Sequence, residues 1–186
     1  MRRSPLVKFT ALSLLICLIF SVALSAGAIP VTGAVDLVGE RQVLSNWCWA
    51  AASVCILRYF GKYATQIELA QYLYGGSYNY PATDQQVKTV LQYKGVSSTY
   101  VADSISFSMI RSEIYTHERP IYAGISWTGT GTGHAVVISG YDQSITPKMV
   151  EYMDPATGSH YTSSYDTFVG STSAGRLWNG TLYRFS

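Results

Sequence analysis

The first half of the chain carries apolar residues at helical spacing, between polar stretches that contain the residue types which begin and end helices. An Ala-rich apolar run from Trp47 to Phe60 predicts one helix, with Ser45 or Asn46 as its N-cap and Gly61 just past its last turn. Two capping boxes, each a threonine followed three residues later by Glu or Gln, predict two further helices, and a fourth ends before a proline. These three helices begin after Thr65, Thr83 and Ser106 and end at Gly75, Gly95 and Glu118.

The second half of the chain reads as strands, because β-branched and aromatic runs replace the helical pattern from Pro120 onward. Asn179-Gly180 lies between two such runs and predicts a type I′ hairpin turn, while the turn-rich segment around His160 predicts a loop. The predicted strands cover Ser97–Ala102, Ile121–Trp127, His134–Tyr141, Met149–Met153, Arg176–Trp178 and Thr181–Phe185. We therefore predict an α+β fold, with a helical part at about 29–104 and a twisted antiparallel sheet at about 105–186.

The N-terminus has the three features of an export signal, namely a basic start, an apolar run and a small-x-small cleavage site. These are Arg2, Arg3 and Lys8, residues 9–24, and Ala26-Gly27-Ala28. We expect cleavage after Ala28, which makes residues 1–28 a signal peptide and residues 29–186 one secreted domain. The alternative is an uncleaved membrane anchor, since the apolar run approaches the roughly 20 residues that span a bilayer.

Composition argues against several classes of function. The formal net charge of +2 includes the three basic residues of the predicted signal, so the expected mature chain carries −1. It has no basic stripe and no base-stacking motif, so we expect no nucleic-acid partner. No Cys or His spacing matches a zinc or iron site, so we expect neither a metal nor a cofactor. The charged fraction of 13% and the 15 tyrosines suit a compact exported protein, and they leave its oligomeric state open.

Cys48 is the candidate nucleophile of the expected mature chain. It falls in the first turn of the first predicted helix, where free backbone N–H groups and the helix dipole favour a thiolate. Cys55 is two turns further on, about 10 Å away, which is too far for a disulfide. Cys17 falls in the segment expected to be removed. The alternative for Cys48 is a small buried apolar residue, the role that we assign to Cys55. A free cysteine in an exported protein is a candidate reactive thiol.

A cysteine nucleophile gains from a neighbouring imidazole that takes its proton and later protonates the leaving group. Three histidines are available. His117 lies at a predicted helix end and His160 in a predicted loop, whereas His134 opens a fully apolar strand directly after a glycine run. A lone histidine at the start of a strand is more often structural, but the carboxylate that the next strand brings beside His134 favours it as the base.

A carboxylate to orient His134 comes from the hairpin that its strand forms with the next one. If Tyr141 lies opposite Met149, the far ends of the two strands coincide. His134 and Asp154 then meet at one end of the hairpin. Asp142 falls at the other end, roughly 27 Å away at about 3.4 Å per residue. Alone, Asp154 reads as a turn residue before a proline, but next to His134 we assign it the orienting role.

The motifs around these residues resemble those of papain-like cysteine peptidases. Gln42 precedes the Cys48-Trp49 pair by six residues, SNWCWAA surrounds the cysteine, and GHAVVISGYD and YMDP contain His134 and Asp154. Together they resemble the small bacterial branch grouped with the C39-like and AvrRpt2-like peptidases, over roughly residues 42–158. The resemblance implies a papain-like fold with its cleft between helices and sheet. It implies Cys48 as nucleophile, His134 as base, Asp154 as orienter, and Gln42 with the Cys48 backbone N–H as oxyanion donors.

We therefore predict a secreted cysteine peptidase that hydrolyses peptide bonds in a protein or peptide substrate through a Cys-His-Asp triad. Two alternatives stay open. One is a transglutaminase-like acyltransferase or amidase that uses the same triad on another acceptor. The other is a catalytically silent secreted domain whose Trp and Tyr side chains grip a ligand.

Overall fold

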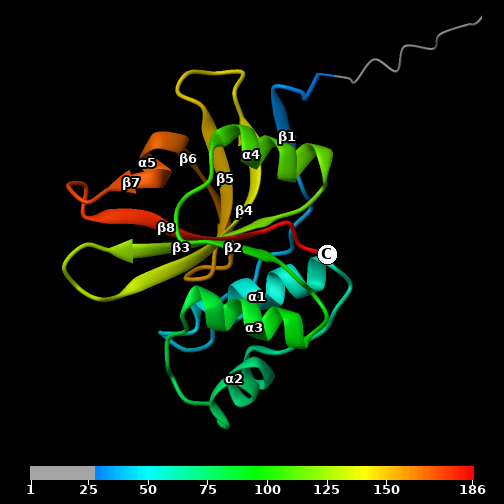
Figure 1. Ribbon diagram of the computed structural model, residues 1–186, viewed down its shortest axis with the longest axis vertical. Coiled ribbons are helices and arrows are strands. Elements are labelled where there is room, and N and C mark those ends of the chain that lie inside the picture. Colours follow the sequence, from blue (N-terminus) through cyan, green and yellow to red (C-terminus); the bar gives the residue numbers. More distant parts are fainter. Residues whose placement is uncertain (1–27) are drawn as a thin grey trace, which may run out of the picture.

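A computed structural model describes residues 28–186 of the chain, as helices packed against one antiparallel sheet. Figure 1 shows three helices, α1 to α3, gathered on one side of the strands and α4 on the other. The predicted signal peptide lies, up to residue 27, outside the described residues. Among residues 28–186, no helix is both long enough and apolar enough to cross a bilayer.

The three predicted helices before residue 95 are confirmed as α1 (Cys48–Tyr59), α2 (Gln66–Tyr74) and α3 (Asp84–Tyr93). Both capping boxes form, because Thr65 and Thr83 each accept from the backbone N–H three residues on, and the Glu or Gln side chain accepts in return. Gly75 then ends α2 in the left-handed conformation.

The predicted N-cap of α1 is wrong. The residue before the helix is Trp47, and no side chain caps it. Ser45 and Asn46 are used differently, because both bind Asn79 of the loop between α2 and α3. Asn79 Oδ1 accepts from the Asn46 backbone N–H at 2.9 Å, and Asn79 Nδ2 donates to Ser45 Oγ at 2.9 Å. The start of α1 is therefore fixed by a distant loop rather than by a local cap.

The sheet has eight strands, and every pair in it is antiparallel. Its order is β2-β8-β3-β4-β5-β6, with β1 paired to β4 and β7 to β8. The strands are β1 (Thr32–Ala34), β2 (Thr99–Val101), β3 (Ile121–Trp127), β4 (Gly133–Asp142), β5 (Met149–Asp154), β6 (Ser159–Ser164), β7 (Gly170–Ser171) and β8 (Arg176–Tyr183). Since β1 and β2 come from the first part of the chain, the sheet ties that part to the second.

The hairpin predicted at Asn179-Gly180 does not form, because β8 runs straight through it. Gly180 pairs with Gly124 and Trp178 pairs with Ile125, so Asn179 is the extra residue of a β-bulge. Asn and Gly occur in bulges as well as in tight turns, so the residue types alone did not distinguish the two. A second correction concerns His160, which lies on the edge strand β6 opposite Met153 and not in a loop.

Helices cover both faces of the sheet. One core cluster joins α1 to Tyr122, Val137 and Leu182, and the other joins α4 (Phe107–Arg111) to Val136 and Ile138. The helix predicted after Ser106 does form, with Ser106 as N-cap, but it continues from Ser112 to Thr116 as a π-helical turn. A short helix, α5 (Tyr165–Val169), was not predicted and also packs in the second cluster.

Adjacent residues of β4 face different cores, because Val136 packs in the second cluster and Val137 in the first. Packing on both faces holds the strand firmly at the base of the cleft.

Candidate active site

The two cysteines among the described residues have different environments. Cys48 is the first residue of α1, is half-buried, and lines a cleft of about 770 Å³. Cys55 is 1% exposed, and burial raises the pKa of its thiol to about 12. A thiol with that pKa is protonated near neutral pH, so Cys55 is an inert core residue and Cys48 is the thiol that a ligand can reach.

Three parts of the chain form most of the cleft. The segment that leads into α1 supplies one wall, the residues around the start of α3 supply a second, and strands β3 and β4 with their connecting hairpin supply the third. The Gly-rich hairpin between Trp127 and Gly133 therefore lies at the edge of the cleft. The lining residues that carry chemistry are Gln42, Cys48, Asp84, Tyr122 and His134.

His134 and Asp154 lie at one end of the β4–β5 hairpin and touch. His134 Nε2 lies 2.6 Å from Asp154 Oδ1, and the two side chains are 19% and 25% exposed. Asp154 Oδ1 also accepts from the backbone N–H of Ala156 at 2.9 Å, which fixes the carboxylate. Because Nε2 is bound to Asp154, Nδ1 is the nitrogen left to exchange a proton with the Cys48 thiol.

The hairpin reaches this arrangement by a different register from the one predicted. Tyr141 pairs with Val150 and not with Met149, so the prediction is wrong by one residue at that end. A register shift between Ile138 and Gly140 then offsets the difference, and Val137 pairs with Met153. The bulge thereby brings His134 and Asp154 together despite the displaced start of the hairpin.

The electrostatics of the pair favour a charged imidazole. Burial works to lower the pKa of His134, but hydrogen bonds to Asp154 and Cys48 and the negative charges of both partners raise it from 6.5 to about 9. Burial works to raise the pKa of Asp154, and the hydrogen bonds from His134 and from the Ala156 backbone outweigh it, so the pKa is lowered. At neutral pH, His134 is therefore the protonated partner of an ionised Asp154.

Gln42 lines the cleft, but its side-chain N–H groups already have acceptors. Gln42 Nε2 donates to the carbonyl oxygens of Leu44 at 3.0 Å and Ser45 at 2.7 Å, while Oε1 is buried without a partner. Its backbone N–H donates to Pro155 O at 2.8 Å, next to Asp154. The residue thus lies at the site, and its amide must turn away from at least one of these carbonyls before it can donate to a substrate oxygen.

The loop between α2 and α3 supports the start of α1, which the sequence did not reveal. Trp47 Nε1 donates to Tyr78 O at 2.9 Å, and Trp49 Nε1 donates to Tyr80 O at 3.0 Å. Both indole rings are 1% exposed. These long-range bonds hold the helix turn that carries the thiol, and only the Trp-x-Trp spacing around Cys48 gave a sign of them in the sequence.

A second group of serine, histidine and carboxylate does not have the geometry of a catalytic triad. His160 Nδ1 lies 3.2 Å from Ser139 Oγ and 3.1 Å from Glu151 Oε1, so one nitrogen faces both groups, while Nε2 donates to Leu37 O at 2.9 Å. Ser139 has no exposed surface. The cluster fastens the N-terminal segment to the sheet.

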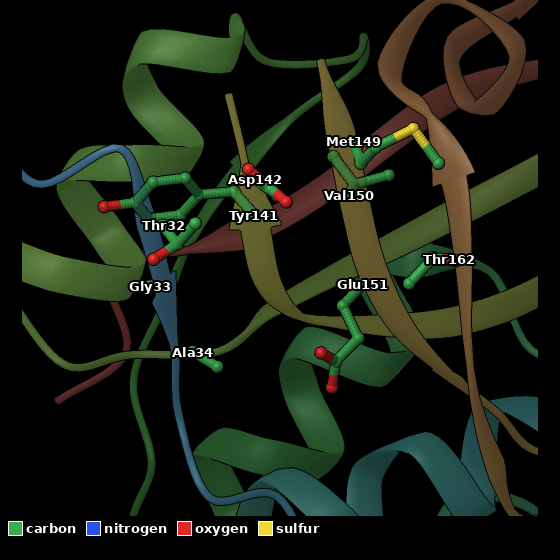
Figure 2. A pocket seen from close by; sticks show the side chains of 9 residues that line it. All are labelled: Thr32, Gly33, Ala34, Tyr141, Asp142, Met149, Val150, Glu151 and Thr162. Carbon is green, nitrogen blue, oxygen red and sulfur yellow. The ribbon is translucent and has the colours of Figure 1, made fainter. Parts of the chain in front are cut away.

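A second pocket, of about 360 Å³, opens between β1, β4, β5 and β6. Figure 2 shows its ionisable side chains, Asp142 and Glu151, with no thiol or imidazole among the residues that line it. Asp142 Oδ1 already accepts two hydrogen bonds, from the backbone N–H and from the hydroxyl of Ser144. Among residues 28–186, no group of three His, Cys, Asp or Glu side chains could hold a metal ion.

Comparisons with known proteins place this geometry in context. A family model described as papain-like cysteine protease AvrRpt2 matches residues 31–173. A C39-like peptidase from Bacillus anthracis aligns with a TM-score of 0.59 at 14% identity, over 82% of this chain and 96% of that one. A double glycine motif protease from an AMS/PCAT transporter, solved with its leader peptide, gives 0.53 at 17% identity, over 82% and 93%.

Interpain A, a cysteine protease of Prevotella intermedia, gives a TM-score of 0.53 at 15% identity, over 83% of this chain and 94% of that one. These identities are low, so the three structures establish the papain-like fold alone. No curated protein matches the sequence significantly.

Proposed function

Because the chain belongs to the family of papain-like cysteine proteases that AvrRpt2 represents, we propose that it hydrolyses peptide bonds with Cys48 as the nucleophile. Membership of the family makes the protein a cysteine peptidase. The roles of the individual residues are what we propose. The family match favours this class over an acyltransferase and over a silent binding domain.

The proposed reaction runs through an acyl-enzyme. The Cys48 thiolate attacks the carbonyl carbon of the scissile bond, and the carbonyl oxygen takes up negative charge. His134 Nδ1–H then gives its proton to the leaving amine as the C–N bond breaks, which leaves a thioester on Cys48. Neutral His134 next takes a proton from water, the resulting hydroxide attacks the thioester, and the carboxylic acid leaves as the thiolate forms again. Asp154 keeps Nδ1 aimed at the sulfur throughout.

The observation that carries the proposal is the 2.6 Å contact between His134 and Asp154 in the cleft that Cys48 also lines. A hydrogen-bonded imidazole and carboxylate beside a half-buried thiol at a helix start form the arrangement in which a nucleophile, its base and the orienter of the base act as a unit. The Cys48 backbone N–H lies in the first turn of α1 and has no acceptor within the helix, so it supports a role as one oxyanion donor.

Gln42 is the proposed second oxyanion donor. Its Oε1 has no partner to lose, so only the two bonds of Nε2 oppose a rotation of the amide toward a bound carbonyl. An oxyanion accepts a charge-assisted hydrogen bond, which is stronger than a bond to a neutral carbonyl. Losing one such donor typically costs about 10²–10³ in rate.

The test is cleavage of a peptide library by the purified chain and by variants. We expect Cys48→Ala to lose all turnover and His134→Ala to lose at least about 10³-fold in kcat/KM. His117→Ala is the matched control, because His117 is exposed and lies outside the cleft. An epoxysuccinyl thiol alkylator should modify Cys48 alone. Turnover that survives in Cys48→Ala would show that the mechanism is wrong.

We also propose that the protein is exported and that its mature chain begins at Ile29. Support comes from the basic, apolar and small-residue order of residues 1–28. The full chain, expressed in a bacterium that exports proteins, should appear in the medium with Ile29 at its N-terminus. A chain that stays in the membrane fraction with residues 1–28 attached would favour the anchor instead.

A further inference from the structure

One carboxylate in the cleft has no cation near it. Asp84 is the first residue of α3 and lines the cleft next to strand β3. Four ion pairs form among residues 28–186, and none of them includes Asp84. Burial raises the pKa of Asp84, and only a hydrogen bond from the Tyr122 hydroxyl works against it. Asp84 is half-buried, so without a cation its negative charge is incompletely compensated.

Two glycines make room for this carboxylate. Gly124 of β3 and Gly180 of β8 pair with each other, and a methyl group added at either position would run into the carboxylate oxygens of Asp84. The side chain therefore rests on bare backbone of the two strands at the floor of the cleft. Neither glycine has a positive φ, so the room that each leaves for the Asp84 carboxylate accounts for the absence of a side chain there.

The carboxylate also shares its cleft with the nucleophile, since Asp84 and Cys48 both line it. The Tyr122 side chain is 2% exposed and lines the same cleft. Burial is the main cause that raises its pKa, and the charges of Asp84 and Cys48 both add to the effect. Asp84 therefore faces the same cleft as the thiol and His134, in which a bound peptide has to lie.

We propose that Asp84 is a specificity residue that binds a cationic group of the peptide substrate beside the scissile bond. The group is an ammonium or guanidinium, carried by a Lys or Arg side chain or by the N-terminal amine of the peptide. The inference rests on the proposed peptidase function. A cation that enters the subsite replaces water around a carboxylate that has no other partner than Tyr122, and forms a charge-assisted hydrogen bond with it. Two neutral polar residues that line the same cleft, Ser126 and Asn179, are bonded to each other at 2.9 Å and leave Asp84 as the charged acceptor.

The test compares matched peptides that carry Lys, Arg, norleucine or Gln at each position around the scissile bond, each with a free and with an acetylated N-terminus. We expect the wild-type protein to prefer the cation at one position by about 10- to 100-fold in kcat/KM, as a charge-assisted bond provides. A preference that depends on the free N-terminus assigns the amine, and one that survives acetylation assigns the side chain.

Asp84→Asn should reduce that preference to less than about threefold, because kcat/KM for the cationic peptide falls by a larger factor than kcat/KM for the norleucine peptide. Asp166→Asn is the matched control, since Asp166 also lies in the first turn of a helix, α5, but is exposed and outside the cleft. If Asp84→Asn fails to fold, Asp84→Ser serves in its place.

The outcomes separate this inference from the proposed function. If the wild-type protein cleaves no peptide, or Cys48→Ala cleaves equally well, the proposed function fails and the subsite with it. If Cys48-dependent cleavage occurs without a cation preference, or the preference survives in Asp84→Asn, the subsite alone is wrong.

Discussion

At the scale of single residues, the chemistry depends on how strongly Asp154 holds His134. The 2.6 Å contact involves side chains that are only 19% and 25% exposed, so solvent screens the attraction weakly. The pKa of His134 rises to about 9 in the fold, against 6.5 for a free imidazole. A raised pKa means that the protonated form is stabilised by folding. That stabilisation is complete below pH 6.5 and is lost as the pH rises through about 9.

The first prediction follows from this shift. His134 must be protonated to give its proton to the leaving amine, so kcat/KM should fall on the alkaline side with an apparent pKa of about 9. Asp154→Asn removes the negative charge, so the alkaline limb should move toward lower pH and the maximal rate should fall on the order of 10²-fold. Rates of peptide cleavage from pH 5 to 10 measure both effects. An unchanged alkaline limb in Asp154→Asn would mean that this carboxylate does not set the state of His134.

The sequence could predict this pair because the two residues are close along the chain. Only one hairpin separates His134 from Asp154, so its two strands bring them to the same end, although the bulge between Ile138 and Gly140 could not be predicted. The state of Gln42 could not be predicted. The hydrogen bonds of its side-chain amide depend on the backbone conformation of Leu44 and Ser45 before α1. The pattern of apolar and polar residues contains no information on that conformation. Asp84 was missed for the same reason, since its neighbours Gly124 and Gly180 come from distant strands.

At the scale of elements, the sequence predicted a helix end correctly where the capping residues are close together in the chain. Thr65 and Thr83 lie three residues from their partners, so both capping boxes could be read directly. The start of α1 has no such local cap, and its partner Asn79 lies more than 30 residues away. The prediction of a turn at Asn179-Gly180 was wrong, because the bulge found there depends on pairing with β3, a strand more than 50 residues earlier in the chain. An interaction is predictable from sequence when the residues that make it are near in sequence.

The second prediction concerns the link between Asn79 and α1. Asn79 binds the Asn46 backbone and Ser45 Oγ, two and three residues before Cys48, so it positions the thiol without touching substrate. Asn79→Ala should lower kcat by roughly 10-fold or more, because a displacement of about 1 Å at a nucleophile is costly. The free energy of unfolding should fall by only about 1 kcal/mol, since the bonds are exposed.

Asn79→Asp is the matched control for that change. Its carboxylate keeps an acceptor for the Asn46 backbone N–H and for the Ser45 hydroxyl, so most of the rate should return. Peptide cleavage with kcat and KM determined separately, together with urea unfolding, distinguishes positioning from general loss of stability. Equal rates for the Ala variant and the wild-type protein would show that the loop does not position Cys48.

At the scale of the whole molecule, the cleft depends on how the helices and the sheet pack together. Ala135 and Val137 belong to the core cluster shared with α1, while Val136 and Ile138 belong to the cluster shared with α4. A fully apolar strand is typical of a sheet covered on both faces, so the sequence of β4 did contain this information. The predicted arrangement, N-terminal helices packed against a C-terminal sheet, is correct. Two strands of that sheet, β1 and β2, come from the part of the chain that was predicted to be helical.

The third prediction uses two valines to separate stability from cleft geometry. Val137 of β4 packs in the α1 cluster and Val150 of β5 packs in the α4 cluster, and both have no exposed surface. Replacing either by Ala removes two buried methyl groups, so each variant should lose roughly 1.5–3 kcal/mol of unfolding free energy in urea. Only Val137→Ala loosens the contact between α1, which carries the thiol, and the strand that carries His134. Its kcat/KM should therefore fall several-fold below that of Val150→Ala under conditions where both are folded. If the two variants lose activity equally, the distance from sulfur to imidazole is set by something other than the packing of α1 on β4.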